Sequence, residues 1–328
     1  MFQKQVIMRR VLYALAPIFL FSTYLYGWRV PALTAMVYAL AILTEYVFEK
    51  ARGKKVSEAV LVTAGLYALS LPPGVPFWIA AVGIIFAVAI GKEVYGGFGR
   101  NVFNPAITGR LFIYISFPVQ LQQSWMTPGQ LGPVPFADAI SSATPMQIMR
   151  GTAEGSVDWL QMLLGFRAGS IGESAILLIV IAAIYMIATK TAQWRLILST
   201  FLAALATTSA FYFTGIATDI APHLAMMSGS ILYVAVFMST DPVSAPNNPR
   251  AQWVYGAIIG SVSMLVRTFA GFPEGTSFGV MMGNVFASFL DEIIPKPPKK
   301  AKKKTQTKKP VKEVTSAKEA REAKESAA

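Results

Sequence analysis

The sequence Asp138-Ala-Ile-Ser-Ser-Ala-Thr-Pro145 lies inside the one long polar segment of an otherwise apolar chain. This polar segment covers about residues 118–172, and hydrophobic stretches precede and follow it. A loop of this length within a compact protein is usually either functional or disordered. The polar segment therefore divides the chain into two apolar halves and is the first place to look for a functional site.

The composition is typical of a membrane protein. Of the 328 residues, 54% are hydrophobic and 14% are charged, whereas soluble domains carry about 25% charged residues. The chain has no Cys, which excludes disulfides, Cys-ligated iron–sulfur clusters and Cys-based zinc sites within it. A single His excludes a bis-His haem. Any redox chemistry must therefore use an organic cofactor or a partner subunit.

The apolar stretches predict an all-α multi-pass membrane protein with about ten transmembrane helices. The first stretch follows basic residues, as a signal peptide does, but it ends without a small-residue cleavage site, so we interpret it as an uncleaved helix. Several stretches are shorter than the about 20 residues that a full crossing needs, which indicates helices broken by Gly or Pro. The expected spans are residues 11–28, 33–48, 59–71, 77–90, 105–117, 174–189, 196–213, 224–239, 253–269 and 276–290.

The basic residues predict the orientation of these spans in a prokaryotic inner membrane. With the N-terminus in the cytoplasm, all of the 29 Lys and Arg residues fall inside except Arg29, Arg150, Arg167 and Arg267. We therefore expect both termini in the cytoplasm and residues 118–172 outside. Residues 1–295 would form the transmembrane domain. Residues 296–328 would form a disordered basic tail that contacts anionic lipid rather than nucleic acid, because no aromatic residues interleave with its lysines.

Two Gly- and Pro-rich segments interrupt the apolar pattern on the expected cytoplasmic side. They are GGFGRNVFNPA, residues 96–106, and STDPVSAPNNP, residues 239–249. Non-helical backbone at membrane depth is tolerated only where it is buried in protein or lines a polar cavity. Both segments are therefore candidates for a ligand site between helices.

Gly- and Pro-rich connections recur with an offset of five spans. An odd number of spans per repeat inverts the second copy, as in inverted-repeat transporters. This pattern leaves open a channel or transporter without redox function. A structural scaffold for redox subunits is a further alternative.

Five strings, in the right order, resemble the NqrB/RnfD family, and the resemblance covers about residues 12–294. They are GGFGRNVFNPAITG (96–109), ISFPVQLQQSW (115–125), LGFRAGSIGE (164–173), STDPVSAP (239–246) and GFPEG (271–275). Members of this family are membrane subunits of redox-driven Na⁺ or H⁺ pumps. The Rnf complex exchanges electrons between ferredoxin and NAD, and the Nqr complex passes them from NADH to quinone. The resemblance implies a translocase subunit that relays electrons and is not active alone.

The resemblance also implies FMN bound covalently through its phosphate to Thr144. The family motif, Asp-x-x-(Ser/Thr)-Gly-Ala-Thr, corresponds here to Asp138, Ser141, Ser142, Ala143 and Thr144, with Ser142 in place of Gly. A flavin transferase would attach the group, and Glu173 is expected near the wall of its pocket. An ordinary Ser/Thr-rich turn before Pro145 is the alternative.

A second, non-covalent flavin such as riboflavin is expected between the two cytoplasmic-side segments. Asn101, Asn104 and Asp241 are the candidate contacts, because amide and carboxylate groups suit a hydroxyl-rich ligand. Helix capping is the alternative, since Asn104 and Asp241 each precede a proline.

The Rnf type is favoured over the Nqr type by the string ISFPVQ and by the short segment before the first span. The chain has no Cys and no Rossmann glycine pattern, so partner subunits of the complex would react with ferredoxin or NADH. Among other charged residues, Glu45 and Glu49 are expected at the membrane interface. The alternative is that they are ion ligands, because an acid within a membrane segment is a functional candidate. Arg267 is expected either to extend outward or to hold a flavin phosphate.

Overall fold

The computed structural model describes residues 2–126, 128, 143–155, 158–218, 220–270 and 275–296. Three predicted site residues, Asp138, Ser141 and Ser142, lie outside the described residues, as does the basic tail beyond Lys296. The regular secondary structure of the described residues is helical, apart from one short parallel strand pair, β1 (Phe2–Gln3) and β2 (Val56–Ser57). This confirms the predicted helical class.

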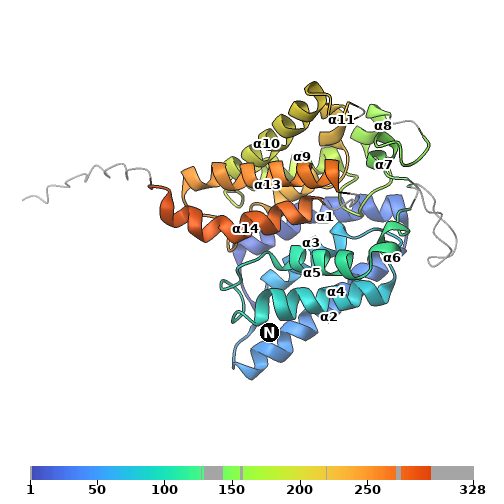
Figure 1. The fold of residues 1–328 in the computed structure, drawn as a ribbon. Coiled ribbons are helices and arrows are strands. Elements are labelled where there is room, and N and C mark those ends of the chain that lie inside the picture. Colours follow the sequence, from blue (N-terminus) through green and yellow to red (C-terminus); the bar gives the residue numbers. More distant parts are fainter. Residues whose placement is uncertain are drawn as a thin grey trace, which may run out of the picture. The chain divides into compact units, whose positions relative to one another are not determined.

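Figure 1 shows the arrangement of the helices, most of which run side by side. In chain order they are α1 (Val6–Tyr26), α2 (Arg29–Ala51), α3 (Ala59–Ser70), α4 (Phe77–Val88), η1 (Ala89–Glu93), α5 (Pro105–Ser116), α6 (Pro118–Gln122), α7 (Pro145–Met149), α8 (Trp159–Leu164), α9 (Ile176–Ala188), α10 (Trp194–Phe213), α11 (Pro222–Met227), α12 (Ile231–Tyr233), η2 (Val234–Met238), α13 (Pro249–Phe269) and α14 (Gly275–Ile293). Both η1 and η2 are single turns of π-helix.

Most helix ends lie within a few residues of the predicted spans, but the span predicted at residues 224–239 is broken. It consists of α11, α12 and η2, with an interruption at Ser228 and Gly229. Gly229 has φ +67°, and a Cβ at this position would lie 1.7 Å from Nη2 of Arg267. Glycine is therefore required here, both for the left-handed backbone and for the close approach of a guanidinium group.

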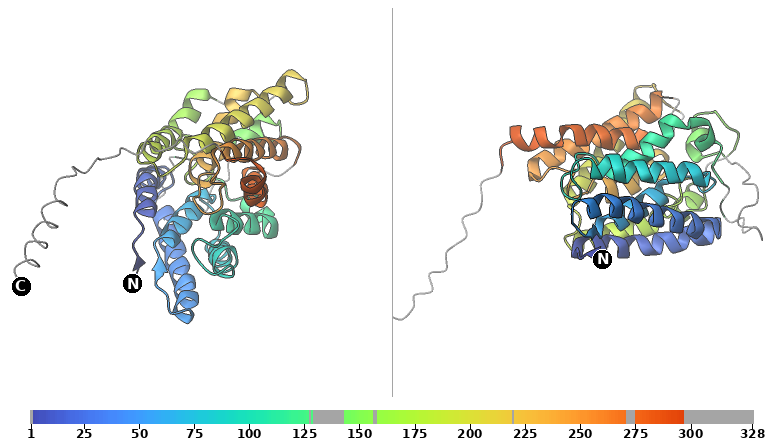
Figure 2. Two further views of the ribbon diagram at one scale, coloured as in Figure 1. Left: turned by 90° about the vertical axis from the view of Figure 1, so that its left-hand side faces the viewer. Right: turned by 90° about the horizontal axis from the view of Figure 1, so that it is seen from below.

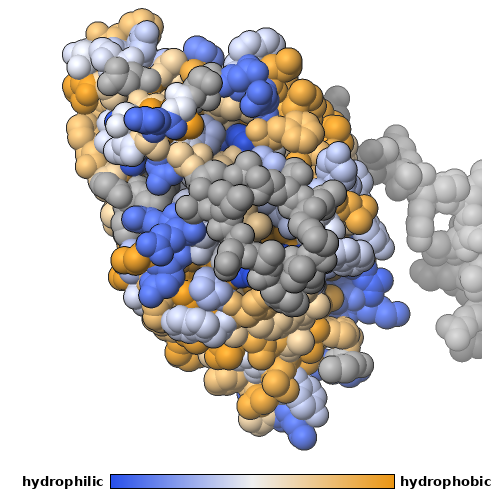
Figure 3. All heavy atoms as spheres, turned by 90° about the vertical axis from the view of Figure 1, so that its right-hand side faces the viewer, coloured by the Kyte–Doolittle hydropathy of each residue, from blue (hydrophilic) through white to orange (hydrophobic). Residues whose placement is uncertain are grey.

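Three helices of the described residues, α1, α2 and α10, are long and apolar enough to cross a membrane by length and composition. Large apolar side chains project outward from the bundle, for example Leu20 at 69% exposure and Ile184 at 63%. On the face in Figure 3, hydrophobic side chains lie mainly along the rim and in the lower part, with hydrophilic patches between them. Exposed apolar surface of this extent fits contact with lipid or with membrane partners. The number of ten crossings stays a prediction.

Glycines set the packing between α10, α13 and α14. A Cβ at Gly260 of α13 would lie 2.4 Å from the Thr200 carbonyl oxygen and 2.7 Å from the Ala204 nitrogen, both in the backbone of α10. On α14, a Cβ at Gly279 would lie 2.6 Å from the Ile259 carbonyl oxygen of α13. Small residues four apart let helix backbones approach closely in membrane proteins, and Gly256 and Gly260 are spaced in this way.

The first five long segments are α1 to α5, and the last five are α9, α10, the broken segment from α11 to η2, α13 and α14. The two sets share a pattern of contacts between helices. Helix α4 packs against α2 and α5, and α13 packs against α10 and α14. Between the halves, α1 contacts α9, and α5 contacts α14. This pattern is compatible with an inverted five-span repeat, which stays a prediction. Figure 2 shows the same helices from two further sides.

Candidate functional site

The connections between the long helices gather at two opposite ends of the bundle. We call one the Asp241 end (residues 2–5, 52–58, 94–104, 189–193 and 239–248). We call the other the Thr144 end (residues 27–28, 71–76, 117–126, 143–155, 158–175 and 220–230). At the Asp241 end, the Gln5 amide donates to Glu58 and the Asn104 amide donates to Asn284. At the Thr144 end, Ser22 donates to the Ile171 carbonyl. Each end holds one of the two predicted groups of site residues.

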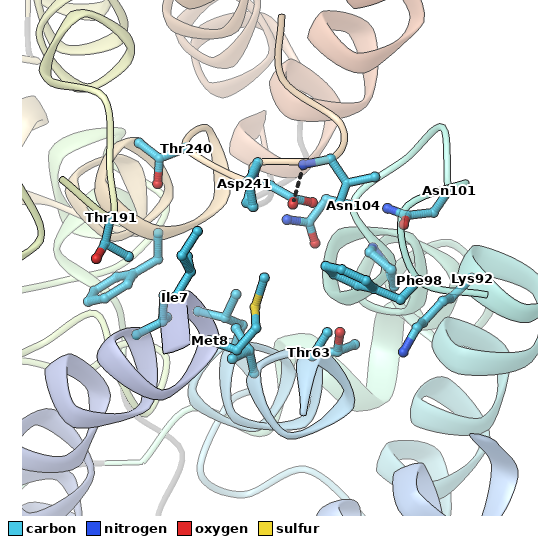
Figure 4. Close-up of a pocket in the computed structure, with 18 of the residues that line it drawn as sticks. Ile7, Met8, Thr63, Lys92, Phe98, Asn101, Asn104, Thr191, Thr240 and Asp241 are labelled. Atoms are coloured by element: carbon cyan, nitrogen blue, oxygen red, sulfur yellow. Dashed lines mark hydrogen bonds between the residues drawn. The ribbon is translucent and has the colours of Figure 1, made fainter. Parts of the chain in front are cut away.

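A cavity at the Asp241 end brings together the predicted residues Asn101, Asn104 and Asp241 (Figure 4). We call it the Asp241 cavity, and its empty space, counted with its open mouth, is about 620 Å³. Polar residues line one side, and apolar side chains such as Ile7 and Met8 line another. The remaining lining residues include Val11, Thr63, Leu66, Lys92, Phe98, Thr191, Phe237 and Thr240.

Asn104 both caps a helix and lines the cavity. Its side-chain oxygen accepts from the amides of Ala106 at 3.0 Å and Ile107 at 3.4 Å, at the start of α5. The capping alternative is therefore confirmed for Asn104. Asn101 donates to the Phe103 carbonyl at 3.0 Å, which keeps its side chain within the same loop.

Asp241 does not cap a helix, so the capping alternative is wrong for this residue. Its carboxylate accepts from the Val243 amide at 3.1 Å and from the Ser244 hydroxyl at 2.9 Å within a turn. Helix α13 begins later and is capped by Asn248. Burial raises the pKa of Asp241, and these two hydrogen bonds act in the opposite direction. A half-buried carboxyl on a cavity wall is a candidate functional residue.

A second pocket, the Thr144 pocket, lies at the other end and contains the predicted residues Thr144 and Glu173. Its empty space is about 350 Å³. The other lining residues are Trp125, Pro145, Met146, Arg167, Ala168, Gly229, Ser230 and Arg267. Ala143, also predicted, is half-buried directly before Thr144. The polar segment, the break at Gly229 and the end of α13 therefore meet at the pocket that contains the Thr144 hydroxyl.

Thr144 is the N-cap of α7. The Gln147 amide donates to its hydroxyl at 3.4 Å, and the Thr144 amide donates to the Gln147 side chain at 2.8 Å. Together these bonds form a capping box. The turn alternative is thus correct as a description of the local backbone. It does not exclude a modified hydroxyl, since Thr144 also faces the pocket.

Two arginines are buried in the Thr144 pocket, at 5% exposure for Arg167 and 3% for Arg267. Arg167 donates Nη2 to the Glu173 carbonyl at 2.8 Å, whereas its Nε and Nη1 have no hydrogen-bond partner among the described residues. Arg267 donates Nη2 to the Ser228 carbonyl at 3.0 Å, so the expectation that it extends outward is wrong. Burial lowers the pKa of Arg167, and the nearby Glu173 carboxylate opposes this shift.

The sequence interpretation missed a buried ionic group beside the Asp241 cavity. Lys92 donates to the Glu45 carboxylate at 2.5 Å and to the Ser57 hydroxyl at 2.8 Å, and Lys92 and Glu45 are each 1% exposed. Glu49 is buried as well, at 5%. Glu45 and Glu49 are therefore not surface residues of the membrane interface. The apolar sequence around Glu45 and Glu49 could have predicted their burial, because an acid within an apolar helix needs a partner.

These observations define a helical, multi-pass membrane protein with a polar pocket at each end of its helices. The chain belongs to the NQR2, RnfD, RnfE family, whose model matches residues 2–299. This confirms the resemblance to the NqrB/RnfD family.

Three similar proteins are all named as the same subunit of the Na(+)-translocating NADH-quinone reductase. The protein of Azotobacter vinelandii is 33% identical over 274 residues, which cover 79% of this chain and 66% of the relative. The protein of Chromohalobacter salexigens is 35% identical over 263 residues, covering 78% and 63%. The protein of Yersinia pestis is 34% identical over 278 residues, covering 79% and 65%. The chain thus matches slightly less than two thirds of the length of these relatives.

Proposed function

We propose that this chain is the flavin-carrying membrane subunit of a redox-driven ion pump of the Na⁺-translocating NADH–quinone reductase type. The observation that carries the proposal is the meeting of Thr144, Arg167 and Arg267 in one pocket. The names of the relatives support the Nqr type. They do not support the Rnf type, which the string ISFPVQ favoured.

In this proposal, FMN is joined through its phosphate to the Thr144 hydroxyl. Arg167 suits the phosphate because its Nε and Nη1 groups have no partner among the described residues, and the planar guanidinium fork matches phosphate oxygens. Arg267 adds a second buried cation, and Glu173 closes the pocket. Asp138, Ser141, Ser142 and Ala143 would complete the motif that a flavin transferase recognises.

The Asp241 cavity is the proposed site of a second, non-covalent flavin such as riboflavin. Asn101, Asn104 and Asp241 offer donors and acceptors for the hydroxyl groups of a ribityl chain. The apolar wall that includes Ile7 and Met8 offers a surface for a flat ring.

Bound flavin would supply electron transfer, and this chain would supply binding, orientation and exclusion of water. Partner subunits would carry out reactions with NADH and quinone, and the pump would move Na⁺ or H⁺.

We further propose a bacterial inner-membrane location with the Asp241 end and the basic tail in the cytoplasm and the Thr144 end outside. Residues 1–295 would be the membrane domain. The contact-defined unit Met1–Lys296 supports that boundary.

Replacing Thr144 by Ala should abolish covalent flavin, because Ala has no hydroxyl to form the phosphoester. The measurement is flavin fluorescence of the chain on a denaturing gel, after co-expression with a flavin transferase. Thr152→Ala is the matched control, since Thr152 lies just after α7 and is exposed; it should keep full fluorescence. A fluorescent Thr144→Ala chain, or a dark wild-type chain, would contradict the proposal and favour the non-redox transporter or scaffold.

Replacing Asp241 by Ala should reduce non-covalent flavin in the purified protein at least about tenfold, since the loss of one charged hydrogen bond costs about 1.5–3 kcal/mol. The measurement is the amount of flavin released by acid precipitation per mole of chain. Asp158→Ala serves as the control, because Asp158 caps α8 at the opposite end. Equal flavin content in Asp241→Ala and wild type would show that Asp241 only shapes its turn.

A further inference from the structure

A group of ionic and polar residues, all buried except Arg52, separates the Asp241 cavity from a second hollow at the same end. We call it the Lys92 cluster, and its members are Glu45, Glu49, Arg52, Ser57, Lys92 and Glu93. Lys92 pairs with Glu45 at 2.5 Å, and Arg52 pairs with Glu93 at 2.6 Å and with Glu49 at 2.9 Å. Helix α2 and the π turn η1 are therefore joined by ion pairs across their buried faces.

The charges in the Lys92 cluster do not balance. It contains three carboxylates but only two cations, Lys92 and Arg52. Glu93 is 0% exposed, and its Oε1 atom has no hydrogen-bond partner among the described residues. Lys92 Nζ lies 4.0 Å from Glu93 Oε1. An extra buried negative charge is costly, so binding of one proton by this carboxylate is favoured by its surroundings.

Every charged group that faces Glu93 from the elements packed against it belongs to this cluster. They are Glu45 and Glu49 from α2, Arg52 from the end of α2, and Lys92 from η1 itself. Helix α5 meets η1 at Gly91 through uncharged Pro105 and Thr108. Helix α4 carries no charged residue. The protonation of Glu93 therefore depends on these four groups and on whatever charge enters the cavity beside them.

The cluster faces a hollow on each side. Lys92 lines the Asp241 cavity. On the other side, Glu45, Glu49 and Ser57 line an open pocket that also includes the exposed residues Lys54 and Lys55. We call this the Ser57 pocket; its empty space is about 900 Å³. Water can thus reach the outer side of the cluster, while a ligand in the Asp241 cavity would lie against its inner side.

We propose that Glu93 is a redox-linked protonation site that takes up a proton when the ligand of the Asp241 cavity is reduced. The inference rests on the proposed function, in which that ligand is a flavin. The electron comes from a one-electron donor, which is the covalently bound flavin in the pump. Glu93 itself lines neither hollow, so a proton from water in the Ser57 pocket passes through the cluster from the side of Glu49. It forms an O–H bond with the Glu93 carboxylate, and oxidation releases it again. The charge of the electron and that of the proton cancel within the cluster.

Lys92 couples the two events physically. A negative charge added to the cavity attracts Lys92 and repels the Glu93 carboxylate, and both effects favour the protonated acid. Without proton uptake, the interior would hold another uncompensated charge. Lys92 thus acts as a positioning residue between the ligand and the titrating group.

The test is a spectroelectrochemical titration of the non-covalent flavin at several pH values. The full chain carries Thr144→Ala, so that only this flavin is observed. With Glu93 present, the midpoint potential should fall more steeply with pH than in Glu93→Gln. The difference should reach up to about 59 mV per pH unit, the value for one proton per electron. Glu93→Asp should restore the steeper slope, and Glu292→Gln, which removes an exposed carboxylate at the same end, should leave it unchanged.

Two further readouts keep the proposal falsifiable. If Glu93→Gln does not fold, Glu45→Gln provides the test. Loss of this neighbouring negative charge makes Glu93 harder to protonate. The pH range in which the midpoint potential falls steeply should therefore move to lower pH. Protons bound on reduction by dithionite, counted with an indicator dye, should also decrease in Glu93→Gln. A flavin-loaded Glu93→Gln protein with the wild-type slope and proton count, or an unmoved steep region in Glu45→Gln, overturns the inference. An absence of non-covalent flavin from the wild-type chain would instead overturn the proposed function.

Discussion

Replacing Lys92 by Met should lower the midpoint temperature of unfolding by about 10 °C. The substitution leaves the Glu45 carboxylate buried at 1% exposure without the cation that lies 2.5 Å away. Removing one partner of a buried ion pair costs about 3–5 kcal/mol. Each kcal/mol shifts the midpoint by about 2–4 °C in a protein of 150–250 residues, and by less in this longer chain. Tryptophan fluorescence of the purified protein during heating gives the measurement.

A double variant separates loss of the ion pair from loss of packing. In Lys92→Met with Glu45→Gln, the unpaired charge is gone, and the Gln side-chain oxygen can still accept from the Ser57 amide, as Glu45 does at 2.8 Å. Most of the lost stability should return. A single variant that unfolds within about 2 °C of wild type would show that water or neighbouring groups neutralise Glu45, contrary to the structure.

Replacing Gly260 by Leu should separate α10 from α13 and destabilise the protein by about 3 kcal/mol or more. Even the first carbon of the new side chain would lie 2.4 Å from the Thr200 carbonyl oxygen. Backbone cannot move aside as the tip of a flexible side chain can, so the helices must shift. The expected result is a lower unfolding midpoint, together with a smaller monodisperse fraction in size-exclusion chromatography.

Val254→Leu is the control for this prediction. Val254 lies on the same helix, but its side chain is 41% exposed, so a larger group meets no backbone and stability should be unchanged. Gly256→Leu should behave like Gly260→Leu, because a Cβ there would lie 2.9 Å from the Thr200 nitrogen. Equal stability of Gly260→Leu and Val254→Leu would contradict the close approach of the two helices.

The positions of the helices could be predicted from the sequence because apolar runs and prolines are local signals. Pro105 and Pro249 mark the observed starts of α5 and α13. The break at Gly229 could not be predicted in this way, because its cause lies 38 residues later, in the guanidinium of Arg267. The π turns also escaped prediction. η2 is as apolar as α12, and the Gly, Lys and Glu of η1 do not by themselves indicate a π turn.

The candidate site was partly predictable for a similar reason. Asn101, Asn104 and Asp241 stood out as polar residues in interrupted apolar stretches, and the structure places all three on one cavity. Glu45 was misinterpreted because its partner Lys92 lies 47 residues away. Arg167 was predicted only as one of four basic residues on the outer side, and the three-dimensional structure places it in one pocket with Thr144. Burial and pairing depend on distant segments, which spacing along the chain does not reveal.

The two π turns have a geometric consequence for the Asp241 cavity. Each is five residues long, and each directly precedes a segment that lines this cavity. A π turn holds one residue more than the hydrogen-bonding pattern of an α-helix allows. Deleting one residue from Ala89–Gly91 would restore α-helical geometry and rotate Lys92 by about 100° relative to α4. The side chain would then leave the wall that it shares with Glu45. A single step in helical register, rather than the identity of any side chain, determines the direction in which this charge points.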